Sequence, residues 1–146
     1  MSRVRAREVD LLAELLEAEH AAVYGYGVLG ARLDEQTRRA ALAAFDVHRA
    51  RRDAVAAQLR TRGAEPQPGL PAYDVAVADA PGAVALAVRL EEGMALRWRD
   101  LVGGTDDRDL RRFAAAGLTA AAVRATGWRT AVGAGPRTAA LPGTAG

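Results

Sequence analysis

A proline- and glycine-rich stretch from Gly63 to Gly82 divides this 146-residue chain into two halves. The prolines within it are Pro66, Pro68, Pro71 and Pro81. Such a stretch cannot form a regular helix, because proline lacks the backbone N–H and clashes with the preceding turn. On both sides of it, apolar residues recur at steps of three and four, which is the spacing of one helical face. Half of the residues are hydrophobic but only 5% are aromatic, and alanine dominates, so we expect an all-α protein.

The periodicity predicts two pairs of helices. The expected helices cover residues 7–33, 35–62, 83–102 and 107–125 or slightly beyond. Gly63 is well suited to end the second helix, and Thr105 or Asp106 would cap the fourth. Short links make the helices of each pair antiparallel, whereas the long link can carry the chain from one end of a bundle to the other. Two antiparallel hairpins joined by a long crossover is the connectivity of ferritin-like four-helix bundles.

We therefore expect a single ferritin-like bundle over residues 1–131. The remaining residues, 132–146, are rich in Gly, Ala, Thr and Pro, and we expect them to form a flexible C-terminal tail.

A charged residue lies in the middle of the apolar face of the first expected helix. Glu19 falls between Leu16 and Val23 in a stripe that is otherwise apolar, aromatic or glycine. A buried carboxylate without a partner is destabilising by several kcal/mol or takes up a proton, so partners are expected across the core. The inward stripes of the other three helices also carry ionisable residues. The predicted polar core network comprises Glu19, His48, Arg52, Glu91 and Arg124.

Three glycines, Gly25, Gly27 and Gly30, occur in the first expected helix. Together they weaken a helix by roughly 2–3 kcal/mol relative to alanine. We therefore expect another backbone or a bulky ring to come close to them, with Trp98 or Trp128 as the first candidates.

Three segments carry a resemblance to a known family. The most distinctive is A-E-H-A-A-V-Y-G-Y-G at residues 18–27, supported by H-R-A-R-R-D at 48–53 and L-E-E-G at 90–93. Over roughly Val9 to Arg129 the chain resembles DUF4439, an actinobacterial ferritin-like domain family of unknown function. The resemblance implies a four-helix bundle that forms a small oligomer, and it supplies no established activity.

The ligand set of a di-iron protein is incomplete in this chain. Ferritin-like di-iron proteins place one Glu on each of two helices and a Glu-x-x-His pair on each of the other two. Here Phe45 stands three residues before His48, and no acid or histidine follows Asp109. The candidate metal ligands that remain are Glu19, His48 and Glu91. These could hold one iron or manganese ion, but the arginines of the predicted network supply the positive charge themselves. We favour a metal-free network without a cofactor and keep iron or manganese as the alternative.

These residues assemble no complete nucleophile, acid–base pair or metal cage. We therefore expect a non-enzymatic structural or binding role centred on the buried Glu/His/Arg network. The alternative is a metal-dependent oxidoreductase or metal-binding protein that uses the reduced Glu/His site, so whether the chain is an enzyme stays open, and no small-molecule ligand can be named.

The composition limits the expected cellular location and the expected binding partners. The chain has no cysteine, no apolar run of membrane-spanning length and no secretory signal at its start, so we expect a cytoplasmic protein that is not bound to a membrane. The net charge is only +2 and acids are interspersed among the arginines, so nucleic acid is not an expected partner. Surplus alanine-rich helix faces favour a homodimer.

Overall fold

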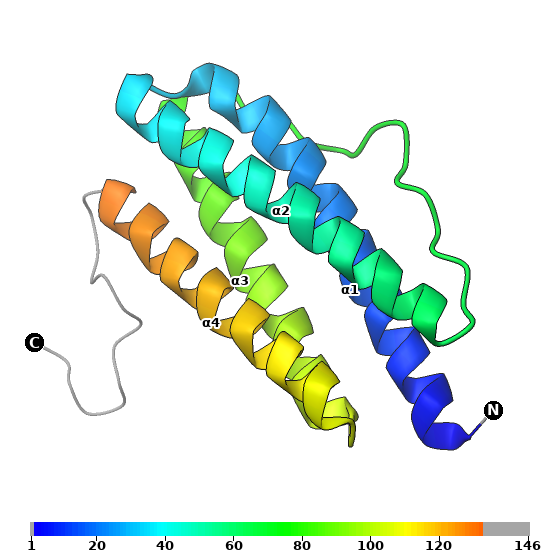
Figure 1. Ribbon diagram of the computed structural model, residues 1–146. Coiled ribbons are helices and arrows are strands. Elements are labelled where there is room, and N and C mark those ends of the chain that lie inside the picture. The colour runs from blue at the N-terminus through cyan, green and yellow to red at the C-terminus, as the bar shows by residue number, and fades with distance from the viewer. Residues whose placement is uncertain (1, 133–146) are drawn as a thin grey trace, which may run out of the picture.

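The computed structural model describes residues 2–132, which form four long helices and one short 3-10 helix (Figure 1). The helices are α1 (Arg3–Leu29), η1 (Gly30–Arg32), α2 (Glu35–Thr61), α3 (Ala80–Gly104) and α4 (Arg108–Val132). The all-α ferritin-like bundle predicted from the sequence is confirmed. Apart from Val132, which ends α4, the tail predicted over residues 132–146 lies outside the described residues.

The helix ends differ from the predicted ones where side-chain caps decide them. The α1 helix begins at Arg3, because the side chain of Ser2 accepts a hydrogen bond from the backbone N–H of Arg5 at 3.1 Å. The cap of α4 is neither Thr105 nor Asp106. Instead, Asp107 Oδ1 accepts hydrogen bonds from the backbone N–H groups of Asp109 and Leu110, at 2.9 and 3.0 Å. The α4 helix also continues past Ala125 to Val132, and Trp128 within that extension is buried.

The two helical pairs pack through α1 and α3. The backbones approach closely between α1 and α2, between α1 and α3, and between α3 and α4, whereas α2 and α4 approach less closely. The crossover from α2 to α3 runs along the outside of the bundle (Figure 1). It contacts α1 where His20 Nε2 lies 3.1 Å from the carbonyl oxygen of Gln67 and where the rings of Tyr24 and Tyr73 lie 5.6 Å apart. The side between α2 and α4 is therefore the least tightly closed.

The apolar core consists of two clusters, one in each half of the bundle. The first contains Leu16, Val55, Met94 and Ala121 among others, and the second contains Tyr26, Ala44, Ala87 and Trp128 among others. Each helix carries an ionisable residue that was predicted to lie in the core. In the sequence of each helix, this residue lies between a member of the first cluster and a member of the second. The apolar clusters therefore enclose a polar layer.

The glycines of α1 are not covered by a tryptophan ring. A Cβ at Gly25 would lie 2.8 Å from the side chain of Leu90, whereas Trp98 packs against Gly117 of α4, where a Cβ would clash with the ring. The expectation that Trp98 or Trp128 packs on the α1 glycines is therefore wrong. The close approach that requires glycine lies instead within the α3–α4 hairpin, between Trp98 of α3 and Gly117 of α4.

Candidate functional site

Three ionisable side chains from three helices meet at the centre of the bundle. Glu19 of α1, His48 of α2 and Glu91 of α3 are each 0% exposed. His48 lies between the two carboxylates, with Nδ1 2.7 Å from Glu19 Oε2 and Nε2 2.8 Å from Glu91 Oε1. A carboxylate can only accept, so both bonds form together when both ring nitrogens carry a proton. With both acids ionised, this geometry suits an imidazolium between them.

A fourth helix contributes a guanidinium to the same site. Arg124 Nε donates a hydrogen bond to Glu91 Oε1 at 3.0 Å, and the arginine side chain is 19% exposed. Two acids and two cations thus meet here, with formal charges that sum to zero when His48 is protonated and both acids are ionised. We call Glu19, His48, Glu91 and Arg124 the central cluster. The structure brings these four predicted residues together.

Two aromatic side chains extend the central cluster. Tyr26 donates from its hydroxyl to Glu91 Oε1 at 2.6 Å and accepts from the indole N–H of Trp128 at 2.9 Å. The ring of Tyr26 also stacks on that of His48, with centroids 5.4 Å apart. Glu91 Oε1 therefore receives hydrogen bonds from His48, Arg124 and Tyr26, which fixes its position.

The pKa values in the central cluster shift in different directions. Burial alone would lower the pKa of His48, but the hydrogen bonds and charges of Glu19 and Glu91 outweigh it and raise that pKa to about 9. Burial raises the pKa of Glu19 above its usual value despite the bond from His48. Burial also opposes ionisation of Glu91, yet His48, Arg124 and Tyr26 together lower its pKa. At neutral pH His48 and Glu91 therefore carry opposite charges.

Not every polar atom of the central cluster is paired. Glu19 Oε1 and Glu91 Oε2 are buried and have no hydrogen-bond partner among the described residues. A buried acceptor without a donor is destabilising by about 1–3 kcal/mol, and such atoms in native proteins call for an explanation.

Arg52 does not join the central cluster, which corrects the prediction. Its Nε and one terminal nitrogen both lie 3.0 Å from Oδ1 of the neighbouring Asp53, and its side chain is 28% exposed. Residues 51 and 52 lie midway along α2 between the buried residues His48 and Val55. Arg51 and Arg52 therefore fall on either side of the buried face of the helix. Arg51 extends over the rings of Trp98 and Phe113, at 5.7 and 5.8 Å. Another guanidinium beside Glu19 and Glu91 would add an uncompensated buried charge.

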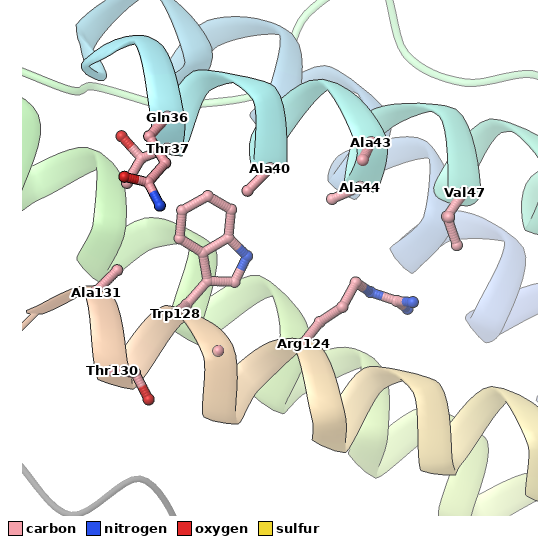
Figure 2. Close-up of a pocket in the computed structure, with 11 residues that line it drawn as sticks. Gln36, Thr37, Ala40, Ala43, Ala44, Val47, Arg124, Trp128, Thr130 and Ala131 are labelled. Atoms are coloured by element: carbon pink, nitrogen blue, oxygen red, sulfur yellow. The ribbon is translucent and has the colours of Figure 1, made fainter.

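A groove of about 680 Å³ adjoins the central cluster between α2 and α4 (Figure 2). Its lining residues are Gln36, Thr37, Ala40, Ala43, Ala44, Val47, Arg124, Gly127, Trp128, Thr130 and Ala131. Figure 2 shows the Trp128 ring standing between the two helices and Arg124 extending from α4 towards Val47. Arg124 therefore faces Glu91 on one side and the groove on the other.

The central residues do not fit a metal ion as they are arranged. A metal-bound imidazole must present a lone pair, but both ring nitrogens of His48 face carboxylate oxygens. The fourth helix contributes Arg124 where a di-iron site has an acid or histidine. Across residues 2–132 no group of three or more His, Cys, Asp or Glu side chains is arranged to hold a metal.

The family assignment follows from comparison with known sequences and structures. The model of DUF4439, a domain of unknown function, matches residues 12–146. This chain belongs to the DUF4439 family. A crystal structure of a conserved hypothetical protein from Mycobacterium tuberculosis is 37% identical and superposes with a TM-score of 0.85, covering 94% of this chain and 98% of that one. Among curated proteins, no sequence matches the chain.

A more distant structure shows the fold alone. The crystal structure of a ferritin-like, diiron-carboxylate protein from Bacillus anthracis shares 14% identity with the DUF4439 protein. It superposes with a TM-score of 0.81, covering 90% of this chain and 99% of that one. No helix in the described part of the DUF4439 protein is both long and apolar enough to cross a membrane.

A second buried polar cluster was missed by the sequence argument. Glu8 of α1 accepts from Arg62 Nε at 3.1 Å through Oε2 and from the Thr105 hydroxyl at 2.6 Å through Oε1. We call Glu8, Arg62 and Thr105 the end cluster; all three are buried. Arg62 also donates to the backbone and side-chain oxygens of Gln58, at 3.1 and 2.7 Å. The end cluster joins α1, the end of α2 and the link between α3 and α4.

Proposed function

We propose that this DUF4439 protein is a non-enzymatic binding protein in which the central cluster stands in place of a metal centre. One observation carries the proposal: both ring nitrogens of His48 are engaged by the carboxylates of Glu19 and Glu91. With Arg124 on Glu91 as well, the acids are neutralised by protein cations. A cation would have to displace one of these bonds and add charge to a site that is already balanced.

The groove supports the binding part of the proposal. It opens directly beside the central cluster and has mostly apolar walls, which is typical of ligand-binding sites. Arg124 belongs to both the central cluster and the groove. The central cluster would therefore fix the position of a residue that lines the groove rather than catalyse a reaction.

Metal analysis tests the proposal. The protein would be purified without an affinity tag and without chelators, and its metal content measured by plasma mass spectrometry. We expect iron and manganese far below one equivalent per chain, and the same melting temperature with and without EDTA. Stoichiometric iron or manganese that EDTA removes with a fall in melting temperature would contradict the proposal.

One observation favours a second candidate, a metal-dependent oxidoreductase. The buried oxygens Glu19 Oε1 and Glu91 Oε2 have no partner among the described residues, and two carboxylates with an imidazole suit iron or manganese. Glu19→Gln separates the candidates. The metal-free protein should lose about 1 kcal/mol of unfolding free energy, because the new amide N–H₂ is buried without an acceptor, and its metal content should not change. A metalloprotein would instead lose its metal. Glu17→Gln, at an exposed position of the same helix, is the matched control.

A further inference from the structure

We propose that the groove between α2 and α4 binds a small molecule that joins an apolar tail to a single carboxylate, with Arg124 as the anchor of the carboxylate. This inference rests on the proposed binding function and names the ligand class for the same groove.

The walls of the groove suit an apolar tail. The α2 side presents the small side chains of Ala40 and Ala43 and the larger Val47, and the α4 side presents Gly127 and the ring of Trp128 (Figure 2). Its volume of about 680 Å³ lies within the usual range of small-molecule sites, roughly 300–1,000 Å³. An extended hydrocarbon or aryl chain would lie along these walls between the two helices.

Arg124 is positioned as an anion anchor. Its Nε bond to Glu91 Oε1 fixes the guanidinium, while its two terminal nitrogens make no hydrogen bond to any residue within 2–132. Figure 2 shows this end of the side chain reaching towards Val47 of α2, another residue that lines the groove. The paired N–H groups of a guanidinium match the two oxygens of a carboxylate, and Arg binds such groups with two parallel bonds.

The charge of the lining favours a monoanion. Arg124 is the one charged residue among those that line the groove in the described part of the chain, and the other polar lining groups are the neutral Gln36, Thr37 and Thr130. A phosphate ester carries close to two negative charges at neutral pH and would require further cations. A carboxylate carries one charge, and Arg124, which also pairs with Glu91, is the single guanidinium that the groove lining offers it.

The test uses the two indole N–H signals of the full-length protein in a nitrogen–proton NMR spectrum. Trp128 lines the groove, whereas Trp98 packs against Gly117 in the other half of the core, so Trp98 is an internal control. Dodecanoate is added below its micelle concentration, and dodecanol serves as the uncharged probe. We expect dodecanoate to move the Trp128 signal with saturation while the Trp98 signal stays in place, and dodecanol to bind at least tenfold more weakly.

Two variants locate the ligand. Gly127→Phe should abolish binding by filling the groove, since a Cβ at that position meets no described atom within 4 Å. Gly93→Phe is the matched control, because Gly93 is an exposed helical glycine of α3 that also has open space around it and does not line the groove. Arg124→Gln should weaken dodecanoate at least tenfold and leave dodecanol unchanged. The dodecanol comparison and Gly127→Phe keep the test valid if Arg124→Gln does not fold.

Several outcomes would overturn the inference. One is an affinity for dodecanol equal to that for dodecanoate, and another is a Trp128 signal that does not move at about 1 mM dodecanoate. A third is a dimer that dissociates in Gly127→Phe but not in Gly93→Phe, because the occupant of the groove would then be a second copy of the chain. Nuclear Overhauser contacts from Trp128 to Leu141 in the free protein would make the chain's own C-terminal residues the occupant. Metal content is measured on the same sample: failure of metal-free protein to bind overturns this ligand class alone, whereas stoichiometric metal overturns the proposed function.

Discussion

The central cluster and the end cluster both bury carboxylates between helices, but they differ in how completely those carboxylates are paired. In the end cluster, each oxygen of Glu8 has its own donor, from Arg62 and from Thr105. In the central cluster, three donors converge on Glu91 Oε1, while Glu91 Oε2 and Glu19 Oε1 have none among the described residues. The more deeply buried cluster is the less completely satisfied one.

We propose that this difference reflects different roles for the two clusters. A fully paired buried group stabilises one arrangement of the chain, and the end cluster does this where three segments meet. Unpaired buried acceptors are destabilising, and proteins keep such features mainly at sites that do something besides fold. The central cluster also adjoins the groove through Arg124. We therefore propose that the end cluster is purely structural, whereas the central cluster contributes to stability and also positions Arg124 in the groove.

The largest expected effect comes from removing the shared partner of the central cluster. His48→Leu leaves Glu19 and Glu91 buried without the cation between them, and we expect the free energy of unfolding to fall by about 3–5 kcal/mol. Urea denaturation followed by circular dichroism measures it. A loss below about 1 kcal/mol would mean that His48 is not an imidazolium bound by both acids.

The pH dependence of stability gives the next largest effect. The folded pKa of His48 is raised to about 9 from 6.5, so its contribution is fully present below pH 6.5 and is lost as the pH rises through 9. We expect the free energy of unfolding to fall by about 3 kcal/mol over this window. Arg62→Met, which removes the ion pairs of Arg62 with Glu8 and Asp107 but leaves the central cluster intact, should keep the same fall. A free energy of unfolding that stays constant from pH 6.5 to 9 would mean that folding does not raise the pKa of His48.

Breaking the end cluster should have a smaller effect on stability and none on binding. Arg62→Met leaves Glu8 Oε2 without its donor, and we expect a loss of about 2 kcal/mol in urea denaturation. Arg60→Met, at an exposed position of the same helix, is the control and should change little. Dodecanoate should bind Arg62→Met with unchanged affinity; a tenfold loss would show that the two clusters are not separate in function.

The smallest effect is expected at Thr105. Thr105→Val preserves the shape but removes the hydroxyl that donates to Glu8 Oε1, while Arg62 still neutralises the carboxylate. We expect a loss of about 1 kcal/mol in the same denaturation experiment. A loss as large as that of Arg62→Met would mean that the hydroxyl, rather than the ion pair, holds the end cluster.

The sequence predicted the fold well because helix spacing and turn chemistry are local. The proline-rich crossover and the helical periodicity on both sides of it were sufficient for the ferritin-like bundle. The same spacing placed Glu19, His48, Glu91 and Arg124 on inward faces, which the structure brings together. Tyr26 lies two turns after Glu19 and Trp128 one turn after Arg124, so the signal for their inclusion was present in the periodicity.

Other features depended on contacts that spacing does not specify. Arg52 lies one turn after His48, yet a guanidinium can leave the core on either side, and it pairs with Asp53. The end cluster joins Glu8 to Thr105, which lie in different helical pairs, so only the assembled bundle reveals it. The predicted homodimer and the absence of a cofactor stay predictions, and the metal analysis addresses the second.

The most direct test of the account is the protonation of the His48 ring, read from its two ring-nitrogen chemical shifts by NMR at pH 7. We predict that Nδ1 and Nε2 both carry a proton and that EDTA leaves both signals unchanged. A ring with one unprotonated nitrogen, or a nitrogen signal that moves when EDTA removes a metal, would contradict the claim that protein cations alone neutralise the buried acids.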